Sequence, residues 1–315
     1  MSIRIAVDLG GTHLRAAAFR KDETEAVKHK KTTSRSSDES IFERLLGLIK
    51  EVMPEAEDVS GIGVAVPGPV DPVKGIIIDT PNIPEMNGFP LVERLNEKLG
   101  IPVYLGNDAN LAALGEWRYG AGQGHDHLLY FTISTGVGGG VICDGRLLEG
   151  SAGLGAEVGH VVVKAEDEGP ACGCGHHGHL EALSSGTGIA NYVEWRLEDS
   201  ETESSLRSSA KRDAMTIAEA AREGDPLAIE AYERAGHYLG VGVSSFLHIF
   251  NPSVLIFGGG VSQSRDLFWK PFEVSLRENL FNPAYLENLV ITTAALGDDA
   301  GLMGALALVE TKESP

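Results

Sequence analysis

The chain has 315 residues, 43% of them hydrophobic and 23% charged, a globular composition that excludes the disordered and fibrous classes. That length predicts two lobes rather than one large domain. The net charge is −19, from 45 acidic and 26 basic residues. It excludes nucleic acid as a partner, because no basic stripe is present to displace the counterions of a polyanion.

The sequence predicts a cytoplasmic protein with no membrane partner. Its start, Met1 to Ile5, is not a charged leader followed by an apolar segment, so no signal peptide is expected. No apolar run reaches the length that spans a bilayer. Three cysteines do not make a disulfide framework, and the closely spaced thiols of Cys172 and Cys174 suit a reducing compartment.

The first part of the chain predicts alternating strands and helices. Apolar runs predict strands at 3–8, 14–19, 61–66 and 103–105. Gly10 and Gly11 form a tight turn between the first two strands. Apolar residues at helical spacing predict helices at 41–53, 91–99 and about 109–119.

The second part repeats this pattern. Strands are predicted at 128–134, 140–143 and 253–257. A glycine-rich turn at 136–140 joins the first two of these strands. Asp225 and Pro226 predict the start of a long helix that reaches Phe250, because proline is tolerated in the first helical turn. The alternation is typical of an α/β fold, and the repeated hairpin predicts two similar lobes facing one another across a cleft.

Three polar segments are interpreted as surface. The acidic runs at 166–168 and 198–203 are expected to be solvated, and the serine-rich stretch at 200–210 is predicted to be a mobile insertion.

The two glycine-rich hairpins predict a nucleotide site. Gly10 and Gly11 follow Asp8, so backbone N–H groups can approach phosphate oxygens closely, and Asp8 could hold a hydrated Mg²⁺. The second hairpin, at 134–140, offers the same chemistry. One such turn usually only reverses the chain, whereas two at matching places indicate a ligand that touches both.

Two other nucleotide-binding classes are excluded. No Gly-x-x-x-x-Gly-Lys-Ser/Thr segment occurs, which excludes the P-loop class. Gly173-x-Gly175-x-x-Gly178 matches the dinucleotide-binding fingerprint in form only, because it does not follow a strand.

The segment between residues 153 and 181 predicts a structural metal site. Cys172 and Cys174 are one residue apart, with histidines before and after them, so a Cys2His2 shell can close around Zn²⁺. The alternative is a chance pair of cysteines in a histidine-rich surface loop. The glycines beside the two thiols permit a tight turn and favour the metal. The flanking carboxylates of Glu157 and Glu181 are suited to binding a polyol.

Four motifs occur in order along the chain: Asp8-Leu9-Gly10-Gly11-Thr12, Asn107-Asp108-Ala109-Asn110, Glu157-x-Gly159-His160 and Cys172-x-Cys174-Gly175-x-x-Gly178. Together they resemble the ROK sugar kinases of the actin-like ATPase superfamily, over essentially the whole chain. Within that family, residues 107–122 and the segment Pro81-Asn82-Ile83-Pro84 are most similar to the bacterial glucokinases.

The resemblance implies a two-lobed actin-like ATPase fold, of the ribonuclease H-like type, with duplicated α/β domains around a cleft. The N-terminal lobe is expected to span 1–118 and to be joined by a C-terminal helix at about 298–315. The C-terminal lobe is expected to span 119–297 and to carry the metal loop, 160–181. A homodimer or homotetramer is also implied.

The resemblance further implies that the chain phosphorylates a hexose at the expense of Mg²⁺-ATP, and D-glucose is the expected sugar. Asp108 would be the general base that takes the proton of the attacking sugar hydroxyl. Its structural alternative is the N-cap of the following helix. The sugar would be bound by Gly68, Asn82, Asn107, Asp108, Glu157, His160 and Glu181. The nucleotide would be bound by Asp8, Gly10, Gly11, Thr12, Thr135, Gly136 and Gly259.

The implied zinc ligands are His160, Cys172, Cys174 and His179. The family usually has a third cysteine where this chain has His179, and nitrogen can replace sulfur in a tetrahedral zinc shell. Two further departures bear on the identity of the sugar. Gly106 stands where a glutamate commonly precedes Asn-Asp, and Met86 stands where glucokinases often have tryptophan.

Other functions remain as alternatives. A sugar-sensing repressor of the family would carry a helix-turn-helix ahead of a hairpin that here begins at Ile3, and it could lose the aspartate. A zinc hydrolase would need an open coordination position on the metal. The sequence contains no His-Glu-x-x-His motif of the kind that many zinc hydrolases use. Kinases for N-acetylmannosamine, fructose, mannose or allose remain open, and the low cationic charge disfavours polyphosphate as donor.

Overall fold

The computed structural model describes residues 2–34, 40–55, 57–80, 82–166, 169–199, 201 and 203–313. Outside these ranges lie Pro81 of the predicted sugar loop, residues 167–168 and parts of 198–203 in the acidic runs and the serine-rich insertion, and residues 314–315 of the predicted C-terminal helix. No helix within the described ranges is both long and apolar enough to cross a membrane.

The chain forms two compact units. The first comprises Met1–His125, Gly140–Ala156 and Ala294–Pro315, and the second comprises Asp126–Gly139 and Glu157–Thr293. The first boundary lies after residue 125 and not after the predicted residue 118. The predicted second lobe, 119–297, is not one piece, because residues 140–156 belong to the first unit.

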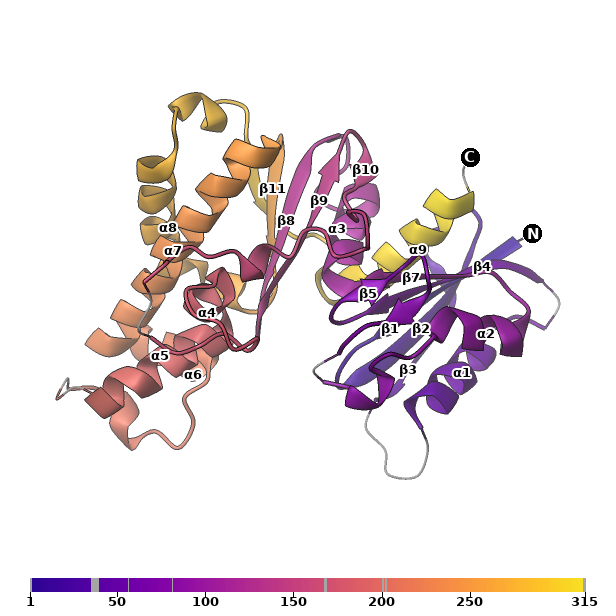
Figure 1. Ribbon diagram of the computed structural model, residues 1–315, viewed down its shortest axis with the longest axis horizontal. Coiled ribbons are helices and arrows are strands. Elements are labelled where there is room, and N and C mark those ends of the chain that lie inside the picture. Colours follow the sequence, from indigo (N-terminus) through magenta and orange to yellow (C-terminus); the bar gives the residue numbers. More distant parts are fainter. Residues whose placement is uncertain are drawn as a thin grey trace. The chain divides into compact units, whose positions relative to one another are not determined.

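The first unit is built on a five-stranded sheet of order β3-β2-β1-β4-β7 (Figure 1). β1 and β2 pair antiparallel, β2 pairs antiparallel with β3, and β4 lies parallel to both β1 and β7. The strands are β1 (Ser2–Leu9), β2 (His13–Arg20), β3 (Ala26–Thr33), β4 (Asp58–Val66) and β7 (Val103–Asn107). A small hairpin follows β4, made of β5 (Val70–Asp71) and β6 (Ile76–Ile77).

Helices cover both faces of this sheet. Successive side chains of a strand point to opposite faces, so the odd residues of β1, such as Ile5, enter the core formed with α1. The even residues face α9, where Arg4 bonds Glu310 and Asp8 lies against Gly301. The helices of this unit are α1 (Ile41–Val52), α2 (Leu91–Leu99), α3 (Asp108–Tyr119) and α9 (Ala300–Glu313).

Close packing of α9 explains two glycines. A Cβ on Gly63 of β4 would lie 2.0 Å from the carbonyl oxygen of Ala305, and a Cβ on Gly304 would lie 1.8 Å from that of Leu111 in α3. Glycine therefore lets the C-terminal helix lie directly on the sheet and on α3.

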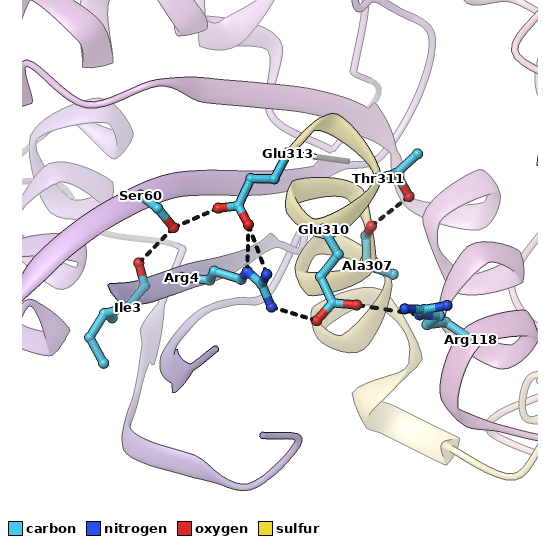
Figure 2. A network of polar contacts seen from close by, with 8 residues as sticks. All are labelled: Ile3, Arg4, Ser60, Arg118, Ala307, Glu310, Thr311 and Glu313. Carbon is cyan, nitrogen blue, oxygen red and sulfur yellow. Dashed lines mark hydrogen bonds and ion pairs between the residues drawn. The ribbon is translucent and has the colours of Figure 1, made fainter. Parts of the chain in front are cut away.

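A buried arginine fixes α9 to β1 (Figure 2). Arg4 is 5% exposed, and its guanidinium donates to Glu310 at 2.7 Å and to Glu313 at 2.8 and 3.0 Å. Ser60 of β4 donates to the other oxygen of Glu313 at 2.5 Å. Arg118 of α3 reaches Glu310 at 3.3 Å, so one network joins two strands and two helices.

The second sheet has the order β10-β9-β8-β11-β12, which repeats the first sheet strand for strand. β11 lies parallel to β8 and β12, and β9 pairs antiparallel with β10. Its strands are β8 (Leu128–Ile133), β9 (Val137–Cys143), β10 (Arg146–Leu147), β11 (Val254–Gly258) and β12 (Val290–Thr293). The helices of the second unit are α4 (Leu180–Ser184), α5 (Gly186–Asp199), α6 (Ala214–Arg222), α7 (Pro226–Phe250) and α8 (Arg265–Asn279).

Most predicted elements are confirmed, and several details are corrected. Asp225 caps α7, as predicted. The turn expected at 136–140 is shorter, because β9 already begins at Val137 and the following glycines lie within the strand. Part of the serine-rich segment is anchored, since Leu206 is 2% exposed and Ser205 donates to Asp225.

Candidate functional site

The first glycine hairpin joins β1 to β2 and contains Gly10, Gly11 and Thr12. The N–H of Gly10 donates to the carbonyl of His13 at 2.9 Å and closes the turn. A Cβ on Gly11 would lie 2.8 Å from the Cβ of Asn82. The predicted phosphate hairpin and the predicted sugar residue Asn82 are therefore direct neighbours within the first unit.

Asp8, the predicted Mg²⁺ ligand, is paired with Arg15, a residue that the sequence analysis missed. The Arg15 guanidinium donates to Asp8 Oδ2 at 2.5 and 3.1 Å and to Asp299 Oδ1 at 3.0 Å. Asp8 and Arg15 lie directly opposite each other in the antiparallel pair. That register follows from the short glycine turn, so the pair could have been found from the sequence.

The start of α3 brings together three of the predicted sugar residues. Asn107 Oδ1 accepts from the N–H groups of Ala109 and Asn110 at 3.0 Å each, and its amide donates to the Gly68 carbonyl at 3.0 Å. Asn107 is therefore the N-cap, and the alternative that gave the cap to Asp108 is wrong. Asp108 is the first helical residue, half-buried, and its Oδ1 accepts from the N–H of Ala109 at 2.8 Å.

Gly68 needs to be glycine for two reasons. Its φ is +88°, and a Cβ there would lie 2.3 Å from the carbonyl oxygen of Asp79. Only glycine adopts this conformation without strain, and it leaves the Gly68 carbonyl in position to accept from Asn107.

The second glycine hairpin, Ser134 to Val137, is held by the segment that begins with α4. Glu181 Oε2 accepts from the N–H of Val137 at 3.0 Å. The N–H of Gly186 donates to the Ser134 carbonyl at 2.8 Å, and that of Thr187 to the Thr135 carbonyl at 3.2 Å. Thr135 and Gly136 are predicted nucleotide residues and Glu181 is a predicted sugar residue, and the hydrogen bond from Val137 to Glu181 was not expected from the sequence.

A cavity of about 830 Å³ opens beside this hairpin, within the second unit. Thr135 lines it, and the predicted Gly259 immediately precedes another lining residue, Gly260. Gly259 has a φ of +85°, and a Cβ there would lie 2.3 Å from the Ile133 carbonyl oxygen. Lining residues that the sequence analysis missed include Gly186, Thr187, Met215, Tyr232 and Gln263. They come from helices that carry no local motif.

The four predicted metal ligands lie together, in the second unit. One donor atom from each of His160, Cys172, Cys174 and His179 can be chosen so that all lie within 4.8 Å of one another. The two histidine Nδ1 atoms are 3.4 Å apart, and the Cys172–His160 and Cys174–His179 S···N distances are 3.8 and 3.3 Å. His176 Nδ1 lies 3.7 Å from Cys174 Sγ, beside the cluster.

The three ligand–ligand distances of 3.4, 3.8 and 3.3 Å are close to the edges of a tetrahedral zinc shell. Bonds of about 2.05 Å to nitrogen and 2.3 Å to sulfur give N···N edges of about 3.3 Å and N···S edges of about 3.6 Å. Burial raises the pKa of the Cys172 thiol to about 12, with hydrogen bonding to Glu181 adding to the effect. A bound cation would offset that cost, because metal ligation deprotonates a thiol.

The predicted sugar residues of the second unit lie in or beside this cluster. Glu181 Oε1 lies 3.2 Å from Cys172 Sγ, and the N–H of His160 donates to the Glu157 carbonyl at 3.1 Å. Desolvation raises the pKa of the Glu157 carboxyl; the nearby Glu181 acts in the same direction and His160 opposes it. Two carboxylates and an imidazole thus lie at the metal loop.

Two sheets of the same strand order, each with a glycine hairpin after its first strand, define the duplicated α/β fold of the actin-like ATPases. The family model described as "ROK family" matches residues 4–312, and the chain belongs to the ROK family.

Three relatives show how far the similarity extends. A glucokinase of Thermotoga maritima is 35% identical over 312 residues, which cover 98% of this chain and 97% of the glucokinase. The crystal structure of a ROK hexokinase from Thermus thermophilus is similar with a TM-score of 0.84 and 34% identity, covering 99% and 100%. A ROK family glucokinase from Streptomyces griseus, in complex with glucose and AMPPNP, has a TM-score of 0.77 and 33% identity, covering 98% and 99%.

Proposed function

We propose that the chain is an ATP-dependent hexose kinase whose preferred substrate is D-glucose, which it converts to glucose 6-phosphate. The observation that carries this proposal is similarity over nearly the full length of glucokinases, one of them with glucose and an ATP analogue bound. The Asn107-Asp108 pair at the start of α3 supplies the carboxylate that such a reaction needs.

In this proposal Asp108 is the general base. Phosphoryl transfer has a loose transition state, so positioning and charge neutralisation provide most of the rate, and the base accepts the proton of the attacking hydroxyl. Asn107 fixes the backbone on both sides, because its oxygen caps α3 and its amide binds the Gly68 carbonyl. Asp108 is thereby held on a rigid element rather than on a loop.

Candidate sugar ligands occur in both units. The first unit contains Gly68, Asn82 and Asn107, and the second unit contains Glu157, His160 and Glu181. The carboxylates and the imidazole of the second unit can pair with the alternating donors and acceptors of a sugar.

The nucleotide is proposed to bind at both glycine hairpins, with its base in the cavity of the second unit. The volume of about 830 Å³ lies in the range of small-molecule sites. Mg²⁺ would be held by Asp8, where it would neutralise phosphate charge. Arg15 already contacts that carboxylate and would compete with the ion for it.

The Cys/His cluster is proposed to hold a structural Zn²⁺. Four donors close the shell and leave no position for a reactive water, which favours a cross-link of the loop over hydrolytic chemistry. The residues that would hold it are His160, Cys172, Cys174 and His179. We also propose a homodimer or homotetramer in the cytoplasm, which light scattering of the purified protein would test.

The deciding experiment measures ADP release with Mg²⁺ and ATP across glucose, mannose, fructose, allose, N-acetylglucosamine and N-acetylmannosamine. We expect the highest kcat/KM for glucose. Preference for another sugar would keep the kinase and reassign the substrate. Binding of a sugar without any turnover would replace the kinase by a sugar sensor.

A further inference from the structure

Glu181 contacts two structures that the proposed function treats separately. One carboxylate oxygen, Oε1, lies 3.2 Å from Cys172 Sγ in the metal cluster. The other, Oε2, accepts the backbone N–H of Val137 at 3.0 Å. Val137 is the first residue of β9 and the last residue of the second glycine hairpin, of which Ser134 and Thr135 line the large cavity.

Gly136 shows how tightly the carboxylate is fitted against this hairpin. A Cβ on Gly136 would lie 2.3 Å from Glu181 Oε2. That distance is far below any ordinary contact, so an alanine here would displace either the carboxylate or the hairpin. The carboxylate can therefore occupy this position only because residue 136 has no side chain.

A hydrogen bond with a charged acceptor, in a half-buried position, is stronger than an ordinary surface bond. Glu181 lies in the first turn of α4, two residues after His179, so the metal loop sets its position. Five and six residues after Glu181, Gly186 and Thr187 hold the same hairpin through backbone hydrogen bonds. Those two bonds hold Ser134 and Thr135. The side chain of Glu181 adds a third hydrogen bond, to Val137 at the other end of the hairpin.

We infer that Glu181 is a positioning residue for nucleotide binding, acting through the Val137 N–H, in addition to its proposed contact with the sugar. The inference deepens the proposed function, because it rests on the hairpin being part of the nucleotide site. Its consequence is that loss of this carboxylate weakens nucleotide binding even when no sugar is present.

Three variants test the inference through nucleotide affinity, measured calorimetrically with Mg²⁺ and AMPPNP in the absence of sugar. Glu181→Ala is expected to raise the Kd about tenfold, the usual effect of losing a hydrogen bond to a charged group. Glu181→Gln retains an oxygen that can accept from Val137 but lacks the charge, so its Kd is expected to lie between those of the wild type and Glu181→Ala. Both variants are expected to bind glucose more weakly.

Glu157→Ala is the matched control, because it removes the other candidate sugar carboxylate of the second unit. It is expected to weaken glucose binding and to leave the nucleotide Kd unchanged. A general disturbance of the sugar site would instead affect the nucleotide in both alanine variants.

Gly136→Ala tests the same contact from the hairpin side. Alone, it is expected to raise the nucleotide Kd, because its methyl group displaces the carboxylate. Combined with Glu181→Ala it is expected to add little, because the group it collides with is gone. Such non-additivity is diagnostic of a direct contact.

The inference is overturned if Glu181→Ala, with wild-type zinc content and Tm, binds AMPPNP as tightly as the wild type. It is also overturned if wild-type protein binds no nucleotide, or if Glu181→Gln is as weak as Glu181→Ala. If Glu181→Ala does not fold, the nucleotide affinities of Gly136→Ala and Glu181→Gln test the inference without it. A wild type that binds AMPPNP in this pattern but phosphorylates no sugar would refute the kinase and leave the role of Glu181 intact.

Discussion

At the scale of single residues, Asp108 carries the strongest chemical prediction. Asp108→Asn keeps the size and a hydrogen-bonding oxygen but cannot accept the hydroxyl proton. We expect kcat to fall about 100-fold to 10,000-fold, with little change in glucose affinity. Steady-state kinetics with calorimetric glucose binding would check this, and wild-type turnover in the variant would remove Asp108 as the base.

The same residues show how far sequence reasoning reaches at this scale. The motif identified Asn107 and Asp108 together, but two adjacent polar residues before a helix can both be the cap, and only backbone geometry assigned it to Asn107. Arg15 was missed although its partner was identified. Its contact depends on strand register, and a second partner, Asp299, is 284 positions away in the sequence.

At the scale of elements, the metal loop carries the second prediction. Replacing Cys172 and Cys174 by serine should abolish zinc binding and lower the Tm by about 5 °C, since a loss of about 2 kcal/mol shifts the Tm of a domain of this size by that much. Glucose affinity should fall with it, because Glu157 and Glu181 flank the loop. Elemental analysis and calorimetry would check both.

Cys143→Ser is the control for that pair, because Cys143 is the other cysteine and lies exposed in the first unit. It should keep zinc, Tm and glucose affinity at wild-type values. A wild-type protein without stoichiometric zinc would contradict the structural-metal proposal directly.

The attachment of α9 gives the third prediction. Arg4→Met leaves Glu310 and Glu313 without their shared partner, and their side chains are 15% and 25% exposed. Breaking a fully buried pair costs about 3–5 kcal/mol, so partial exposure reduces the expected loss of unfolding free energy to about 2–3 kcal/mol. Arg118→Met is the control: Arg118 contacts the same Glu310 but is 55% exposed, so its loss should cost less than about 1 kcal/mol.

The Arg4 network (Figure 2) also has a pH signature. Burial alone would raise the pKa of Glu313, but hydrogen bonds from Arg4 and Ser60 and the charge of Arg4 hold it below its usual value. A carboxyl group whose pKa is lower in the folded state stabilises the protein at a pH above its unfolded-state pKa. That stabilisation is lost as the pH falls through the folded-state pKa. The difference in urea stability between wild type and Arg4→Met should therefore shrink on acidification; a constant difference would contradict the network.

Elements were predictable where local pattern and tertiary role agreed. The limits of α2 were predicted to the residue, because its apolar spacing faces one core and it ends at Gly100, whose φ is +68°. The strand β3 was missed, since Ala26–Thr33 is mostly exposed and carries lysines, which suit the edge of a sheet but leave no apolar pattern. The two-residue strand β10 is too short to leave any pattern.

At the scale of the whole molecule, the duplication was visible in the hairpins, but the division of the chain was not. Residues 140–156 contain the end of β9 and the whole of β10, both strands of the second sheet, and yet belong to the first unit. Nothing in their composition signals this, because unit membership depends on contacts between distant segments. A Cβ on Gly153, for example, would lie 2.1 Å from Pro72.

The return of the chain into the first unit at residue 294 depends on one buried carboxylate. Glu116 is 0% exposed, and its oxygens accept the N–H groups of Ala121 at 2.9 Å, Ala295 at 3.1 Å and Leu296 at 2.8 Å. The carboxylate thus binds the end of α3 to the segment that leads into α9. Both segments lie close to points where the chain passes between the units, after residues 125 and 293.

Glu116→Ala should therefore destabilise the first unit as a whole, because three backbone N–H groups lose their charged acceptor. We expect a loss of about 3 kcal/mol in unfolding free energy, from the loss of hydrogen bonds to a charged group. Glu116→Gln keeps one oxygen and presents an amide to the remaining donors, so its loss should be intermediate. Urea unfolding of both variants would check the order, and equal stability of Glu116→Ala and wild type would show that other contacts hold residues 294–296 in place.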